Sequence, residues 1–201
     1  MTINIVVFIS GNGTNLQKVI DEISLGNLNY NINLVVSNKK KAFGLIRAKN
    51  HGIPTLYLPY IKKNYKSRHH YDKQLGVEVI KAGGDFKYIV CLGWMHILSL
   101  HFLNQFKPNT VLNLHPALPG KFPGKDAITL AYNYYKKYPD SNAETGAMVH
   151  WVVPEIDAGE TISLIKIPID FDDTIDILRK RVQTMEKLVL INALKKLSIL
   201  D

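Results

Sequence analysis

Asn113 and His115 stand two residues apart in the segment Asn113-Leu114-His115-Pro116, which closes an apolar run. If that run is a strand, residues two apart project to the same side, so the amide and the imidazole lie together while Leu114 faces the core. An amide N–H donor beside an imidazole can stabilise the oxyanion that forms when a carbonyl carbon is attacked. The alternative, a strand-end histidine that is only a hydrogen-bonded structural residue, is the commoner case for an isolated histidine.

A second candidate site is the loop Ser10–Leu16, with the sequence SGNGTNL. Its glycines allow close approach of the backbone to a ligand, the N–H groups at a helix start suit a phosphate, and Thr14 and Asn15 add side-chain donors. The loop differs from the dinucleotide fingerprint, because Leu16 stands where a third glycine is needed and no acidic residue follows about 20 positions later. The loop therefore predicts a phosphomonoester site, unless it is a plain strand–turn–helix corner.

A carboxylate in the segment Pro154–Gly159, with the sequence PEIDAG, is the third candidate. An acid on a tight loop can reach the imidazole of His115 and raise its pKa by favouring the cation. Spacing alone does not decide whether Asp157, Glu155 or Glu160 is the partner, and a solvated turn aspartate is the simpler interpretation of Asp157.

The elements that must position these residues alternate along the first 115 residues. Short apolar runs predict strands over Ile3–Ile9, Ile32–Val36, Thr55–Leu58, Tyr88–Leu92 and Thr110–Leu114. Helical spacings predict helices over Leu16–Ile23, Phe43–Asn50, Ser67–Ala82 and Ser99–Phe106. Repeated strand–helix units with short connections predict an α/β fold with a doubly wound, mostly parallel sheet, which binds ligands at the carboxyl ends of its strands.

The rest of the chain has a different pattern. Ala127–Tyr135 is predicted as a helix, and Ala147–Val153 and Thr161–Ile167 as two strands of a C-terminal β-extension. Asp172-Asp173-Thr174 predicts the start of a closing helix, because Asp and Thr side chains accept from the free N–H groups of a first turn. We expect one domain over residues 1–201.

Composition excludes several classes of protein. The chain has 201 residues, of which 46% are hydrophobic and 21% charged, as in ordinary globular proteins. Its single cysteine, Cys91, excludes an internal disulfide and a cysteine-based zinc site. No cluster has metal-ligand spacing, no apolar run approaches ~20 residues, and the N-terminus does not resemble a signal peptide, so we expect a cytoplasmic protein that needs no metal.

The chain is basic, with a formal net charge of +8 and a pI of about 9.4. A basic surface attracts anionic partners and can steer them into a cleft. A solvated, lysine-rich surface explains the charge equally well.

Six segments together resemble the glycinamide ribonucleotide formyltransferases, folate-dependent enzymes of purine biosynthesis with a Rossmann-like fold. The resemblance covers nearly the whole chain and is carried by VVFISGNGTNL, AFGLIRA, GWMHILS, LNLHPALPG, MVHWVVPEIDAG and RVQTME, which begin at Val6, Ala42, Gly93, Leu112, Met148 and Arg181. The Asn-x-His-Pro segment with its later Asp also occurs in other formyltransferases, whereas the first loop and the closing helix are typical of the glycinamide enzymes.

The resemblance implies roles for particular residues. Asn113, His115 and Asp157 match the catalytic residues, and His150 matches a histidine in a supporting role. Gly13, Thr14, Asn15, Gln183 and Glu186 match residues that bind glycinamide ribonucleotide, the first three at its phosphate. The residues that match the folate site are Arg68, Met95, His96, Ile97, Leu98, Asn113, Val153, Pro154, Glu155, Ile156 and Asp157. On this basis we expect the N-terminal half to bind phosphate and the C-terminal half to bind folate.

Three positions depart from the pattern of the family. His96 stands where arginine is frequent, Ala147-Met148 replaces a Thr-Ser pair that precedes the Val-His pair, and Phe122 stands where several members have tyrosine. None of them is a member of the catalytic set, and the exchange at Ala147-Met148 bears on the surroundings of His150.

The implied reaction moves a formyl group from 10-formyltetrahydrofolate to the amine of glycinamide ribonucleotide. Asn113 and a protonated His115 would donate to the formyl oxygen, and Asp157 would keep His115 charged near neutral pH. We expect small-molecule substrates, no nucleic-acid or membrane partner, and a monomer or weak homodimer.

Three other functions share some of these features. A methionyl-tRNA formyltransferase is expected to carry a further tRNA-binding domain, and a formyltetrahydrofolate hydrolase a further N-terminal regulatory domain, for which 201 residues leave no room. A nucleotide- or RNA-binding module fits the charge, but does not need the Asn-x-His pair and the distant Asp.

Overall fold

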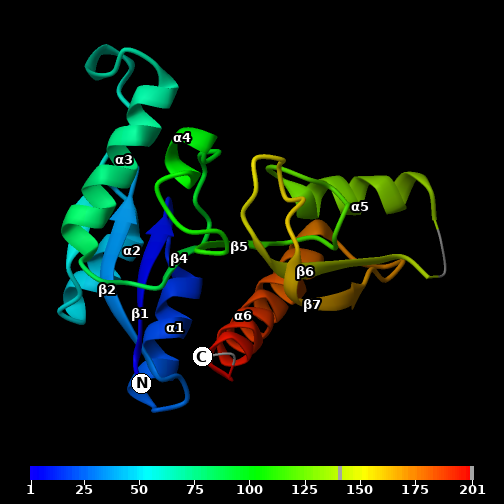
Figure 1. The fold of residues 1–201 in the computed structure, drawn as a ribbon. Helices are drawn as coiled ribbons and strands as arrows, with labels where there is room; N and C mark the ends of the chain where they lie inside the picture. The colour runs from blue at the N-terminus through cyan, green and yellow to red at the C-terminus, as the bar shows by residue number, and fades with distance from the viewer. Residues whose placement is uncertain (140–141, 200–201) are drawn as a thin grey trace. The chain divides into compact units, whose positions relative to one another are not determined.

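The computed structural model describes residues 1–139 and 142–199 (Figure 1). The chain forms two compact units, Met1–Asn113 and Leu114–Asp201. That residues 1–201 act as one domain stays a prediction from the sequence.

Parallel strands build the first unit. β1 (Ile3–Ile9), β2 (Tyr30–Ser37), β3 (Thr55–Tyr57), β4 (Tyr88–Cys91) and β5 (Val111–His115) lie in the order β3-β2-β1-β4-β5, and the last two residues of β5 open the second unit. The intervening helices are α1 (Thr14–Ser24), α2 (Phe43–Asn50), α3 (Arg68–Gly83) and α4 (Leu100–Leu103), with a 3₁₀ turn η1 at Lys62–Asn64. β1 and β4 are buried almost throughout, as expected for a parallel sheet covered on both faces.

The strand order reverses direction between β1 and β4. From β1 the chain adds β2 and β3 on one side, then returns to place β4 and β5 on the other. The loops that follow β1 and β4 therefore meet at the switch point where such sheets bind ligands. These are the loops that contain the predicted phosphate-binding residues and Met95–Leu98, and the Met95 N–H donates to Ser10 Oγ at 2.9 Å.

The second unit contains α5 (Ala127–Lys137), β6 (Glu144–Trp151), β7 (Thr161–Pro168) and α6 (Ile175–Ile199). β6 and β7 pair antiparallel from Glu144 with Pro168 to His150 with Thr161, and they follow β5 in the strand order of the seven-stranded sheet. The predicted α/β fold with a mostly parallel sheet, a β-extension and a closing helix is confirmed. No helix in the described ranges is long and apolar enough to cross a membrane.

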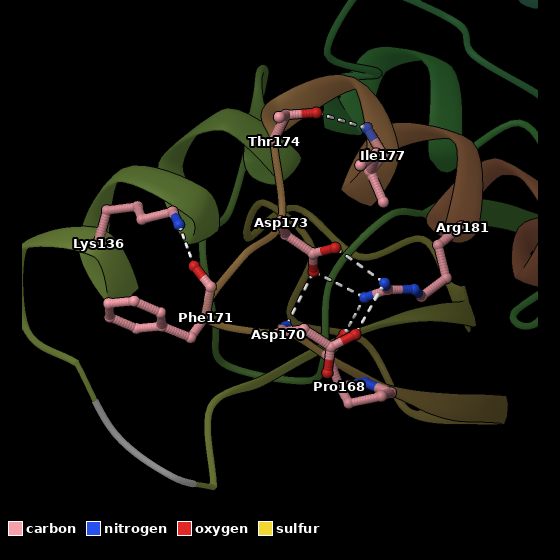
Figure 2. A network of polar contacts seen from close by, with 8 residues as sticks. All are labelled: Lys136, Pro168, Asp170, Phe171, Asp173, Thr174, Ile177 and Arg181. Carbon is pink, nitrogen blue, oxygen red and sulfur yellow. Dashed lines mark hydrogen bonds and ion pairs between the residues drawn. The ribbon is translucent and has the colours of Figure 1, made fainter.

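A polar network fixes the start of α6 (Figure 2). The Arg181 guanidinium donates to both carboxylate oxygens of Asp173 at 2.7 and 2.8 Å, to Asp170 Oδ2 at 2.9 Å and to the Pro168 carbonyl at 2.8 Å. Thr174 Oγ1 accepts from the Ile177 N–H at 3.3 Å, which confirms the predicted helix start. Behind this network, Leu178 and Val182 pack into the core with Ile167. The end of β7 and the first turns of α6 are therefore held as one piece.

We predict that Asp173→Ala lowers the free energy of unfolding by about 2–3 kcal/mol, because it removes the buried partner of a charge that remains. Arg179→Gln is the matched control on the same helix, since Arg179 pairs with Asp176 at the surface, and we expect a change within about 0.5 kcal/mol. Urea denaturation of the full chain measures both. Equal stability of Asp173→Ala and wild type would show that the network does not stabilise the unit.

Candidate active site

The imidazole of His115 lies between a carboxylate and a carbonyl. Its Nδ1 is 3.4 Å from Asp157 Oδ2, and its Nε2 is 3.2 Å from the carbonyl oxygen of Phe122. The side chain of His115 is 5% exposed and that of Asp157 12% exposed, so the pair is largely shielded from water. The structure thus selects Asp157, rather than Glu155 or Glu160, as the carboxylate beside His115.

A second imidazole shares the same carboxylate. His150 Nε2 lies 3.5 Å from Asp157 Oδ1, and His150 Nδ1 lies 2.8 Å from the Trp151 carbonyl. The Gly124 N–H donates to Asp157 Oδ2 at 2.7 Å, and Asp157 itself has a left-handed backbone with φ of 52°. Such a conformation is unfavourable for a non-glycine residue and persists only where surrounding contacts hold it. His150, on β6, therefore contacts the same carboxylate as His115, and the supporting role that the resemblance implies stays a prediction.

Burial and charge act in opposite directions on this cluster. Burial lowers the pKa of His115, the Asp157 charge and the Phe122 carbonyl raise it in part, and His150 lowers it, so the pKa lies below its ordinary value. Burial opposes ionisation of Asp157, but hydrogen bonds from His150 and Gly124 and the charges of both rings hold its pKa below the usual range. Burial therefore opposes the expected charge on His115, because the loss of hydration outweighs the attraction of one carboxylate shared by two rings.

Asn113 is the last residue of the first unit, two residues before His115 on β5. It is half-buried, whereas Leu114 and His115 are both buried. The Asn113 side chain is therefore partly accessible to a ligand.

The predicted phosphate loop opens α1. Gly13 precedes the helix with φ of 70°, a left-handed conformation that suits glycine, and its carbonyl accepts from the Gln17 N–H at 2.9 Å. Thr14 is exposed and Asn15 half-exposed, so both remain accessible to a ligand. Because glycine has no side chain to cap the helix, the first-turn N–H groups of α1 are suited to an anion.

Arg68, at the start of α3, is tied to the segment Met95–Leu98. Its Nε donates to Asp72 Oδ1 at 2.9 Å and its Nη2 to the Ile97 carbonyl at 2.8 Å. The Asp72 side chain is 1% exposed and also accepts from the Ser99 N–H at 3.3 Å. Apart from Asn113, the residues of the first unit that match the folate site are therefore brought together: Arg68, Met95, His96, Ile97 and Leu98.

The other predicted binding residues lie in the second unit. Val153, Pro154, Glu155 and Ile156 form the loop that leads to Asp157, and Gly159 ends the turn where a Cβ atom would lie 1.8 Å from the Trp151 carbonyl oxygen. Gln183 is exposed on α6, and Glu186 is half-buried one turn later. Burial raises the pKa of Glu186 to about 7.

The structure shows what surrounds each of the three positions that depart from the family pattern. His96 packs against the rings of Trp94 and Tyr71. Ala147 and Met148 are buried in β6, in the positions before Val149 and His150. The Phe122 ring packs against Tyr134 and Tyr135 of α5, so the exchange from tyrosine leaves an apolar anchor for this loop.

Several residues that shape the site were not predicted from the sequence. The Phe122 carbonyl and the Gly124 N–H are backbone groups of an irregular loop, which carry no side-chain signal. Asp72 is four residues after Arg68, the spacing of a helical ion pair, and that spacing is the one signal available in the sequence. Within residues 1–139 and 142–199, no group of three or more His, Cys, Asp or Glu residues could hold a metal ion.

The chain was compared with known proteins at three levels. The family model described as formyl transferase matches residues 3–194. The chain belongs to the formyltransferase family. The phosphoribosylglycinamide formyltransferase of Dictyostelium discoideum is 42% identical over 98% of this chain and 99% of its own length, and that of Escherichia coli is 38% identical over 91% and 81%. A crystal structure of glycinamide ribonucleotide transformylase 1 from Symbiobacterium toebii superposes with a TM-score of 0.85 at 32% identity, over 96% of this chain and 86% of that one.

We predict that Asp157→Asn lowers kcat of this formyltransferase by about 100-fold or more, because His115 loses the charge that stabilises its cation. The Asp157 charge raises the pKa of His115, so its loss should also move the acid limb of the kcat/KM profile to lower pH. Glu160→Gln is the matched control, an exposed acid three residues further along the loop. Unchanged kcat in Asp157→Asn, or an equal loss in Glu160→Gln, would contradict the assigned pair.

Proposed function

We propose that this formyltransferase moves the formyl group of 10-formyltetrahydrofolate to the amine of glycinamide ribonucleotide, as a step of purine biosynthesis. The observation that carries the proposal is the shielded contact between Asp157 and His115, which follows Asn113 by two residues on β5. The names of the relatives, phosphoribosylglycinamide formyltransferases from slime mould and bacterium, support the choice of acceptor.

The two substrates are assigned to residues of both units. Gly13, Thr14 and Asn15 bind the phosphate of glycinamide ribonucleotide, and Gln183 and Glu186 bind its ribose. Arg68, Met95–Leu98 and Val153–Asp157 bind the formyl folate. On these loops Met95, Ile97 and Ile156 are 51%, 63% and 50% exposed, and such apolar side chains suit contact with aromatic rings.

Asn113 stabilises the charge that develops in the reaction. The bound formyl folate supplies an activated one-carbon unit, and the primary amine of the second substrate attacks its carbon. The Asn113 side-chain N–H groups donate to the formyl oxygen as it gains negative charge. Loss of one such donor reduces kcat by about 10²–10³ in other acyl transfers.

His115 handles the proton of the attacking amine. Burial lowers the pKa of His115, which favours the neutral imidazole and allows it to take up that proton. The cation that forms lies between the Asp157 carboxylate, 3.4 Å from its Nδ1, and the Phe122 carbonyl, 3.2 Å from its Nε2. When the tetrahedral intermediate collapses, the bond between the formyl carbon and the folate nitrogen breaks, and that nitrogen receives a proton from His115 or through water.

The remaining assignments follow from this activity. Both substrates are small anions, and the net charge of +8 attracts them in a salt-dependent way. Three expectations stay predictions: a cytoplasmic location, a monomer or weak homodimer, and the absence of nucleic-acid and membrane partners.

A formyl-transfer assay on the full chain tests the proposal. The release of tetrahydrofolate is measured with glycinamide ribonucleotide, with methionyl-tRNA or with no acceptor. We expect turnover only with glycinamide ribonucleotide. Turnover with the tRNA, or equal turnover without any acceptor, would replace the proposal with a tRNA formyltransferase or a hydrolase.

Glu186 gives a prediction for pH dependence. Below its pKa of about 7 the carboxyl is protonated, and above it the carboxylate accepts hydrogen bonds from ribose hydroxyls. We expect the KM for glycinamide ribonucleotide to fall as the pH rises through this value. Glu186→Gln should remove this dependence and raise the KM by about tenfold. A wild-type KM without a step near this pH, or the same step in the variant, would show that Glu186 does not bind the ribose.

A further inference from the structure

The segment Ala42–Ala48 carries part of the resemblance, yet the proposed function gives it no role. It forms the start of α2, which lies in the first unit with the phosphate loop. Arg47 joins the two: its Nε donates to the Asn12 carbonyl at 2.9 Å, its Nη1 to Gln17 Oε1 at 3.2 Å, and its Nη2 to Asn12 Oδ1 at 3.4 Å. One guanidinium therefore holds both the loop and the first turns of α1.

The backbone of α2 touches the same loop. A Cβ atom on Gly13 would lie 2.6 Å from Gly44 Cα, and a Cβ atom on Gly44 would lie 2.4 Å from the side chain of Ile9. The Gly44 N–H also donates to the Gly11 carbonyl at 3.2 Å. Arg47 follows Gly44 by three residues, on the same face of α2, and its Cδ is 3.6 Å from the position of that Cβ on Gly13. The two glycines let the backbones meet, and Arg47 covers the junction.

The Arg47 guanidinium donates to oxygen atoms of Asn12, and this direction favours an anion at the loop. Both oxygens of Asn12, the carbonyl and the amide, are occupied by the guanidinium, so they do not face a phosphate bound at the helix start. The guanidinium also lies 4.9 Å from the centre of the Phe43 ring, which fixes its position. Its positive charge adds to the favourable end of the α1 dipole beside the N–H groups of Gly13, Thr14 and Asn15.

We propose that Arg47 is a positioning residue for the substrate phosphate, which sets the shape and charge of the loop through Asn12 and Gln17. This inference rests on the proposed function, in which Gly13, Thr14 and Asn15 bind that phosphate. Because Arg47 acts through the loop, its loss should weaken binding of the phosphorylated substrate without slowing the chemical step.

The experiment compares Arg47→Gln and Arg47→Lys with wild type. We expect Arg47→Gln to raise the KM for glycinamide ribonucleotide by about 10- to 100-fold, with little change in kcat or in the KM for the folate. Arg47→Lys keeps the positive charge but loses the planar guanidinium with its several donors. We expect its KM for glycinamide ribonucleotide to lie between those of wild type and Arg47→Gln, because both the charge and the several hydrogen bonds contribute. Lys49→Gln is the matched control, because it removes the same charge from an exposed position of α2, and its constants should remain those of wild type.

A direct binding measurement separates this inference from the proposed function. Calorimetry with ribose 5-phosphate needs no catalysis, and we expect wild type to bind it at least tenfold more tightly than Arg47→Gln. If wild type transfers no formyl group but this difference holds, the proposed function fails and the role of Arg47 stands. Equal affinities in wild type and Arg47→Gln, or a fall in kcat with both KM values altered alike, would overturn the inference.

Discussion

One carboxylate, shared by two buried imidazoles, is the interaction on which the chemistry of this formyltransferase depends. Asp157 lies within 3.5 Å of both His115 and His150, has a left-handed backbone conformation, and accepts a hydrogen bond at its side chain from the Gly124 N–H. A single negative charge in a shielded site stabilises one imidazolium, and the rings repel one another when both are charged. Burial outweighs the attraction of that charge and shifts His115 toward its neutral form.

In the first unit, side chains of the helices hold the loops at the switch point of the sheet. Two arginines at helix ends perform similar tasks: Arg47 holds the loop after β1, and Arg68 holds the loop after β4 through the Ile97 carbonyl. In the second unit Arg181 fixes the helix that carries Gln183 and Glu186. A guanidinium suits this work, because its planar fork can bind several oxygens at once and stays charged.

Much of this arrangement could be predicted from the sequence. Short apolar runs predicted the strands of the parallel sheet. The segment that contains Asn113 and His115 was correctly predicted to close the fifth of these strands. Spacing left the partner of His115 open among three acids, and only the resemblance indicated Asp157. The direction of the His115 pKa shift could not be predicted, because it depends on burial and on a second ring, His150, that lies 35 residues further along the chain. The contacts of the Phe122 carbonyl and the Gly124 N–H come from backbone groups of an irregular loop. Such contacts cannot be predicted from residue types, because every residue has these backbone groups.

The most direct test of the shared carboxylate is an NMR titration of the imidazole nitrogens of the wild-type protein without substrates. The account predicts that His115 titrates with a pKa below its ordinary value of about 6.5. A pKa above that value, with an imidazolium at neutral pH, would contradict it and restore His115 as a resting proton donor.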